Sequence, residues 1–247
     1  MAWVAEETFD SYSDGDLPAN NGGTGWSNAW QDTYQGTDTD VQGTTTYQGA
    51  KAIQYVGATA SAVQRSLTSA VSSGIMYIAL RAAQTNGGGY AVSLRNSSDS
   101  SIIGIQFDAI DGRGSTGNIY LLGRSGGTPT VATIVSGYSA DTWYAIRLTF
   151  DTGANTFSAA GSSGAFGSGA SYGTESSTLN ALTTGDAARI QLSAESTTAD
   201  YFADYISGTD PLPSSTAIKT VDGLAKASVK TVDQLAIASV KTINGLA

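Results

Sequence analysis

The chain has 247 residues, of which 13% are charged, and its formal net charge at neutral pH is −9. It contains neither cysteine nor histidine, which excludes disulfides, thiolate metal sites and Ser-His-Asp catalysis. We therefore predict that the chain is not an enzyme. The excess of acidic groups also argues against binding to nucleic acid, because affinity for phosphates comes largely from Lys and Arg.

The N-terminal residues show no targeting signal. Met1 to Phe9 has neither the basic n-region nor the apolar h-region of a signal peptide. No stretch approaches the roughly 18 apolar residues of a membrane span. We expect synthesis in the cytoplasm and no membrane partner. If the protein acts outside the cell, it needs another route, such as cell lysis after particle assembly.

From about residue 6 to residue 205, short runs of β-type sequence are separated by Gly-rich turns. In the run Trp143–Phe150, the residues Tyr144, Ile146, Leu148 and Phe150 would share one face of a strand. The predicted strands are Ala50–Val56, Ala62–Leu67, Ile75–Ala82, Tyr90–Arg95, Ile102–Phe107, Ile119–Leu122, Thr130–Val135, Trp143–Phe150, Thr156–Ala160, Arg189–Ala194 and Tyr201–Ser207. No amphipathic segment of helical length competes with them, so we predict an all-β fold, an antiparallel two-sheet jelly-roll sandwich.

Composition divides the chain into three parts. Residues 1–208 form the predicted sandwich, and residues 209–217, which include two prolines, form a predicted linker. Residues 218–247 contain three copies of an 11-residue repeat, the last one incomplete. This tail carries four Lys against two Asp, a charge of +2, so the rest of the chain carries −11.

The tail sequence is compatible with two conformations. Asp222-Gly223 and Asn244-Gly245 are strong hairpin turns beside alternating residues, whereas a period of 11 also corresponds to about 3.67 residues per helical turn. One repeat buries too little apolar area to be stable alone, so the copies must stack on each other, on the body or on a partner. Lysines recur once per repeat, at positions 219, 230 and 241. They either face solvent or form a regularly spaced row that complements an acidic surface on a partner. The predicted assembly residues are Ile218, Lys219, Val221, Val229, Lys230, Val232, Val240, Lys241 and Ile243.

Three segments of the body resemble concanavalin A-like (laminin-G-like) jelly rolls. Glu7–Leu17 together with Gly25–Trp30 resembles their first strand and loop. Thr142–Gly153 resembles their W-Y-x-I-R strand, and Asp200–Ile206 resembles their closing F-D-D-I strand, which pairs near the first. Together these segments frame nearly all of the body. The resemblance implies the same fold.

The tail resembles K-x-(V/I)-(N/D)-G-(L/V)-A-x-A-S repeats from the ends of bacteriophage structural proteins. This resemblance covers only the last thirty residues and implies a virion component, such as a decoration, fibre or tail-associated protein. It also implies a location at a virion surface or in an extracellular assembly.

The concanavalin A-like resemblance raises the question of sugar hydrolysis. Glycoside hydrolases of this fold place two carboxylates on one strand in a Glu-x-Asp-x-(x)-Glu pattern. This chain has only four glutamates, and none has that spacing. Asp108 and Asp111 are the nearest pair of carboxylates, and a hairpin turn explains them better.

Two ligand sites are compatible with the resemblance. Related jelly rolls often bind Ca²⁺, which takes six to eight oxygen ligands. If the first and last strands pair, the carboxylates that would converge are Asp10, Asp14, Asp16, Asp200 and Asp204, of which Asp10, Asp200 and Asp204 are the predicted ligands. Their alternative role is surface charge. For a glycan, the aromatic platform would be Trp26, Trp30 and Tyr34, which lie in a polar, Gly-rich loop. Alternatively, the two tryptophans plug one end of the sandwich. We expect Trp143 to be packed structure.

Our first hypothesis is a non-enzymatic structural protein of a virion or similar assembly, attached through the tail repeats. Its partners would be other virion or assembly proteins, including copies of itself. The alternative is a carbohydrate-binding, lectin-like module that recognises surface polysaccharide.

Overall fold

The structure is a computed structural model. It describes residues 3–34, 38–56, 60–85, 89–107, 117–125, 128–194 and 200–212, together with residues 220–221, 224–225, 231–232 and 235–236 of the tail. Asp108 and Asp111 lie outside the described residues. Within the described ranges, no helix is long and apolar enough to cross a membrane.

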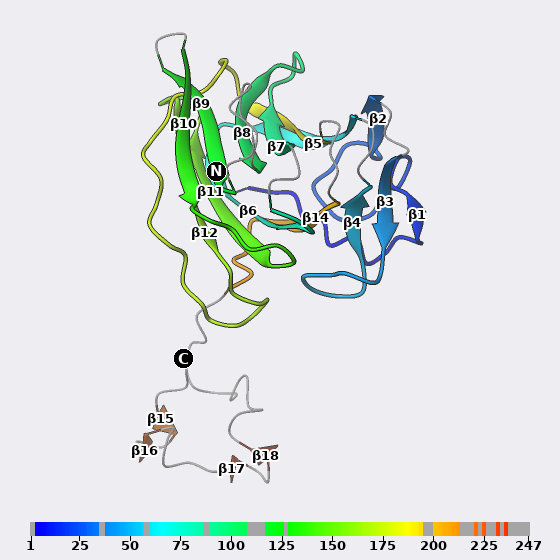
Figure 1. The fold of residues 1–247 in the computed structure, drawn as a ribbon, viewed down its shortest axis with the longest axis vertical. Helices are drawn as coiled ribbons and strands as arrows, with labels where there is room; N and C mark the ends of the chain where they lie inside the picture. Colours follow the sequence, from blue (N-terminus) through cyan, green and yellow to red (C-terminus); the bar gives the residue numbers. More distant parts are fainter. Residues whose placement is uncertain are drawn as a thin grey trace.

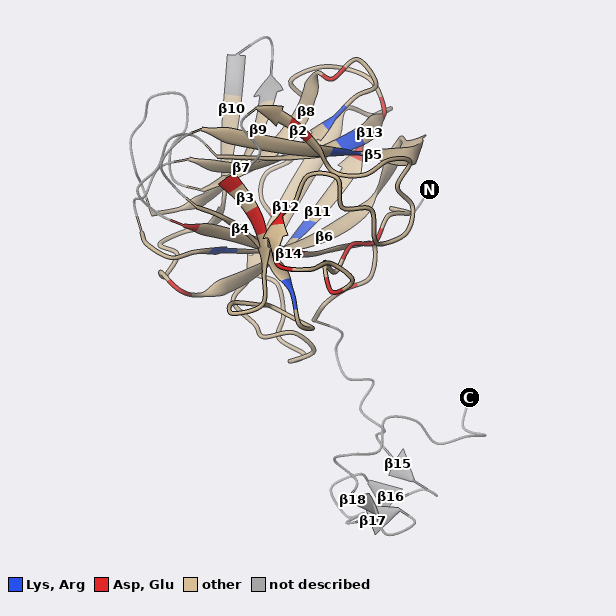
Figure 2. Cartoon of the chain, turned by 90° about the vertical axis from the view of Figure 1, so that its right-hand side faces the viewer, with Lys and Arg blue, Asp and Glu red and all other residues tan. Residues whose placement is uncertain are grey.

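Two seven-stranded antiparallel sheets form the body (Figure 1), and they lie one above the other in Figure 2. Sheet A has the order β1 (Gly15–Asp16), β3 (Thr39–Gln42), β4 (Ala52–Tyr55), β14 (Tyr201–Ser207), β6 (Ser73–Ala82), β11 (Trp143–Asp151) and β12 (Thr156–Ser162). Sheet B has the order β10 (Thr128–Val135), β9 (Ile119–Ser125), β8 (Ser101–Phe107), β7 (Tyr90–Arg95), β13 (Ala187–Ala194), β5 (Ser61–Val71) and β2 (Gln31–Tyr34). The predicted all-β jelly-roll sandwich is confirmed.

Alternation along the strands builds the core between the two sheets. In β11, Tyr144, Ile146, Leu148 and Phe150 all belong to the main hydrophobic cluster, as the sequence predicts. The intervening residues of β11 point to the opposite face of sheet A, because side chains alternate along a strand. Sheet A therefore has one face in the core and one outer face.

The N-terminal segment closes one end of the sandwich around a buried ion pair. Glu7 and Arg65 on β5 are 2.5 Å apart, and each side chain is only 1% exposed. The Tyr12 hydroxyl donates to Glu7 at 2.6 Å, and burial together with this hydrogen bond raises the pKa of Tyr12 to about 12. Loss of one partner would leave an uncompensated buried charge, so this network ties the segment to sheet B.

The body continues past the predicted boundary at residue 208. Leu212 is buried in a small cluster on the outer face of sheet A, and the carbonyl of Pro211 accepts a hydrogen bond from Gly167 at 2.7 Å. Residues 209–212 therefore pack against the sandwich.

The described tail residues form two antiparallel pairs with the same register. β15 (Thr220–Val221) pairs with β16 (Leu224–Ala225), and β17 (Thr231–Val232) pairs with β18 (Leu235–Ala236). Of the two conformations compatible with the repeat, these residues adopt the strand pairing. Val221 and Val232 lie in these strands. The other predicted assembly residues lie outside the described residues: Ile218, Lys219, Val229, Lys230, Val240, Lys241 and Ile243.

Candidate functional site

A row of side chains crosses the outer face of sheet A. The backbone register places in line, from one edge strand inward, Asp16, Asp40, Gln54, Phe202, Arg81 and Trp143. The neighbours of these residues along the strands, such as Tyr144, point into the core. This cross-strand row therefore combines acidic, amide, aromatic and guanidinium groups on one surface.

The surface is hollowed beside the Trp143 end of the row. The hollow measures ≈ 360 Å³, and we call it the Trp143 hollow. Three loops and the start of β11 supply its lining: Thr46, Tyr47, Asp141, Thr142, Trp143, Ser163, Gly164 and Ala165. Segments that are far apart in the sequence thus meet at this one place.

A run of contacting aromatic rings includes two that line the Trp143 hollow, Tyr47 and Trp143. Trp143 contacts Phe202 with ring centroids 6.3 Å apart and Tyr47 with centroids 5.8 Å apart. Tyr47 in turn contacts Phe166 at 5.9 Å, which contacts Tyr205 at 5.5 Å. Phe166 is 45% exposed, and Trp143 is partly exposed. The hollow therefore offers apolar ring surface to a ligand.

An ion pair lies at the rim of the same hollow. Arg81 and Asp141 are 2.5 Å apart, and the Asp141 side chain is 66% exposed. The Arg81 guanidinium lies 4.7 Å from the Phe202 ring centroid, and the backbone N–H of Asp141 donates to the carbonyl of Ala82 at 2.8 Å. Both charged groups are thus held in place, and the exposed carboxylate can accept hydrogen bonds from a ligand.

A buried carboxylate positions the loop that carries Tyr47. Asp204 is fully buried and accepts hydrogen bonds from the backbone N–H groups of Tyr47 at 3.0 Å, Gln48 at 3.1 Å and Tyr205 at 2.7 Å. Burial raises the pKa of Asp204 to about 7, although these three hydrogen bonds favour the charged form. The loop therefore depends on a carboxyl group that titrates near neutral pH.

A second carboxylate holds the end of the same loop. Asp10 accepts hydrogen bonds from the backbone N–H groups of Ala50 at 2.6 Å and Lys51 at 3.0 Å. Between the two attachment points, Gly49 has a φ of 62° and lies so close to Asp10 that a Cβ atom would overlap the carboxylate. Only glycine fits this position without strain.

The predicted calcium ligands do not form a metal site. Asp10 and Asp204 bind backbone N–H groups of one loop, whereas Asp200 accepts a hydrogen bond from the Gln54 amide at 2.9 Å. Across the described ranges, no group of three acidic side chains could hold a metal ion. The prediction that the three carboxylates converge on a cation is therefore wrong. Asp10 and Asp204 do lie near each other, but both accept hydrogen bonds from the backbone of one loop.

The predicted aromatic platform is not assembled either. Trp30 is 1% exposed and packs on Phe9, so it has no ring face for a sugar. Trp26 donates its indole N–H to the Glu6 carbonyl at 3.1 Å, and Tyr34, 57% exposed, lies on the edge strand β2 of sheet B. The alternative that the tryptophans plug one end of the sandwich describes their places better.

Trp143 packs against the small cluster on the outer face of sheet A, as expected, but it also lines the hollow, which we did not predict. The signal was available, because the alternation in β11 puts Trp143 on the face opposite the core residues. The sequence could not show that Tyr47, about a hundred positions earlier in the chain, would contact it.

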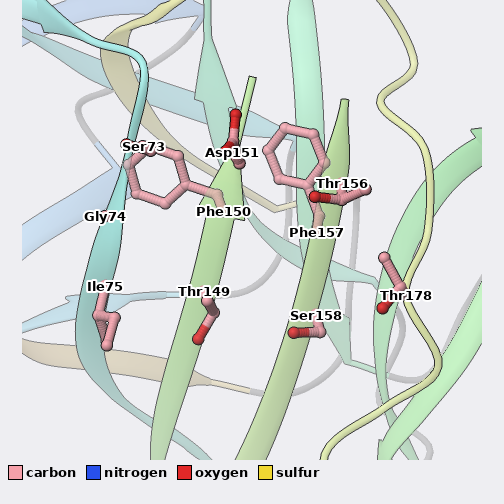
Figure 3. A pocket seen from close by; sticks show the side chains of 10 residues that line it. All are labelled: Ser73, Gly74, Ile75, Thr149, Phe150, Asp151, Thr156, Phe157, Ser158 and Thr178. Atoms are coloured by element: carbon pink, nitrogen blue, oxygen red, sulfur yellow. The ribbon is translucent and has the colours of Figure 1, made fainter. Parts of the chain in front are cut away.

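A second hollow, of ≈ 340 Å³, lies further along the outer face of sheet A (Figure 3). Short side chains from β6, β11, β12 and a loop line it, among them Ile75, Thr149, Ser158 and Thr178 (Figure 3). Its two phenylalanines are buried. Its carboxylate, Asp151, accepts a hydrogen bond from the backbone of the next turn. It therefore offers less to a ligand than the Trp143 hollow.

No protein-family model matches this chain, and no curated protein matches it. Among solved structures, a sialidase superposes with a TM-score of 0.56 at 13% identity, over 84% of this chain and 18% of the sialidase chain. The catalytic domain of a glycoside hydrolase family 131 protein from Coprinopsis cinerea superposes with a TM-score of 0.50 at 13% identity, over 88% of this chain and 97% of that chain. A carbohydrate-binding module, CBM66 from Bacillus subtilis, superposes with a TM-score of 0.44 at 11% identity, over 71% of this chain and 91% of that chain.

The likeness to the family 131 protein contradicts the prediction that the chain is not an enzyme, because a glycoside hydrolase catalytic domain shares the fold over most of the chain. Glycoside hydrolysis depends on two carboxylates, so the absence of histidine and cysteine excludes less chemistry than we expected. The chain has a concanavalin A-like jelly-roll fold, which it shares with glycoside hydrolase domains.

Proposed function

We propose that this protein binds carbohydrate on the outer face of sheet A, at the Trp143 hollow. The observation that carries the proposal is the aromatic run beside the Arg81–Asp141 ion pair. Ligand sites combine apolar and aromatic surface with a few fixed polar groups. Trp143 in the hollow and the exposed Phe166, which contacts the lining residue Tyr47, supply the first. Asp141 supplies a fixed acceptor for sugar hydroxyl groups.

The cross-strand row suggests how a longer glycan would lie. It continues from the Trp143 hollow through Phe202 and Gln54 toward Asp40 and Asp16. Strands in a sheet are about 4.8 Å apart, so the six residues of the row span about 24 Å. We propose that an oligosaccharide lies across the strands along this row.

The fold of the comparison structures supports the proposal. The sialidase and the family 131 catalytic domain are both named for sugar substrates, and they superpose over 84% and 88% of this chain, the sialidase with only 18% of its own length. The virion role, with virion partners and a location at a virion surface, remains a separate proposal that rests on the resemblance of the tail repeat.

A glycan array with the full-length protein tests the proposal. We expect binding to a defined set of glycans. For Trp143→Ala we expect at least a tenfold loss of affinity, because losing the contact area of a large aromatic ring costs about 1.5 kcal/mol or more. The matched control is Tyr34→Ala, an exposed aromatic residue on the other sheet, which should bind like the parent protein.

The bound glycans are then incubated with the protein and analysed by mass spectrometry, which shows whether cleavage accompanies binding. A thermal melt of each variant separates lost binding from lost folding. The proposal is contradicted if the parent protein binds no glycan on the array. It is also contradicted if Trp143→Ala is folded and binds as tightly as the parent.

A further inference from the structure

The tail is a repeated unit that the proposed sugar site does not use. Two consecutive repeats show the same strand pairing: Thr220 faces Ala225, and Thr231, 11 residues later, faces Ala236. The third copy repeats the same residue types up to the end of the printed sequence. The described residues therefore present the same small β unit twice, 11 residues apart.

Each of these units is too small to be stable on its own. Each strand is two residues long, whereas an isolated two-stranded hairpin of ordinary length is at best marginally stable in water. Within the described residues, no third strand pairs with either unit. The outward N–H and C=O groups of such a unit form strand edges onto which another chain can pair.

We propose that several copies of this chain pair with one another through the edges of β15, β16, β17 and β18, so that the protein self-associates through these strands of its tail. A homotypic partner fits best because it carries the same edge, with the same apolar residues, at the same 11-residue spacing. Successive units would then pair in register along two tails. In the described strands these apolar residues are Val221, Leu224, Val232 and Leu235.

The charge distribution supports contact between tails over contact between bodies. The tail carries +2 and the rest of the chain −11, so bodies repel one another at low salt. The tails carry little charge, so the repulsion between them is weaker than the repulsion between bodies. Self-association would make the sugar site multivalent, and linked sites gain avidity without new contacts at the site.

Sedimentation velocity on the full chain over a range of concentrations tests this inference. We expect the parent protein to form a species that is a multiple of the 25.2 kDa chain. The double variant V221D/V232D places a charge in each described unit and should shift the protein to 25.2 kDa. The matched control S228D/S239D adds the same charge to the same repeats at positions outside the described strands and should assemble like the parent.

A parent protein that stays at the mass of one chain at every concentration overturns the inference, as does V221D/V232D assembling as well as the parent. Calorimetry with a soluble glycan separates this outcome from the sugar proposal. The V221D/V232D variant should keep its affinity per site and lose at least tenfold in apparent affinity for a glycan-coated surface.

Discussion

The raised pKa of Asp204 leads to a prediction of how the stability of this protein depends on pH. Its carboxyl group is fully buried, and its pKa is raised from 3.8 to about 7. Between these two values the folded protein holds a proton that the unfolded chain has released. The free energy of unfolding must therefore fall as the pH rises through this window, and it must level off above the folded-state pKa.

The magnitude follows from the two pKa values of Asp204. With 3.8 in the unfolded chain and about 7 in the folded protein, raising the pH from about 5 to about 8 removes about 2.5 kcal/mol of unfolding free energy. For a body of this size, that loss corresponds to about 5–10 °C in Tm. The chain has no histidine and no cysteine, so the side chains that ordinarily titrate in this range do not obscure the effect.

The assay is urea denaturation followed by tryptophan fluorescence at several pH values, for the parent and for Asp204→Asn. The asparagine cannot titrate, so its stability should be nearly constant over this range. It should also lose about 1–3 kcal/mol at low pH, because its amide group cannot accept all of the backbone hydrogen bonds. Asp141→Asn, at an exposed position, should keep the slope of the parent. A flat pH profile for the parent, or an unchanged slope in Asp204→Asn, refutes the reasoning.

Two further substitutions test the framework around the site. Glu7→Gln should lower the free energy of unfolding by about 3–5 kcal/mol, because it leaves Arg65 buried without its counter-ion; a loss below about 1 kcal/mol in urea denaturation contradicts the buried pair. Gly49→Ala should weaken glycan binding and cost about 1 kcal/mol or more of stability, because φ is positive and Asp10 blocks a Cβ atom. Gly137→Ala has a similar φ and open space around it, so it should leave glycan binding unchanged.

Much of the fold could be predicted because its main signal is local. Alternation along β11 shows which residues face a core, and Gly-rich turns show where strands end. These two local patterns predict a two-sheet sandwich without knowledge of any contact between strands. The repeat in the tail is local as well. Its strand pairing is one of the two conformations that the sequence allows.

The candidate site could not be predicted in the same way, because its members come from distant segments. The sequence places Trp30 in a polar, Gly-rich loop and Trp143 at the start of a predicted strand, yet Trp30 is buried at an end of the sandwich and Trp143 lines a hollow. Only the pairing of β14 with β6, and of β6 with β11, brings Phe202, Arg81 and Trp143 into one row.

Composition determined what side-chain chemistry is missing, and alternation determined which residues form the core. Tertiary structure decided which carboxylates meet and what they do. Asp10 and Asp204 lie almost two hundred residues apart and were expected to bind a cation together. Instead, both bind the backbone of the loop that carries Tyr47, because unpaired N–H groups of that loop lie within hydrogen-bonding distance.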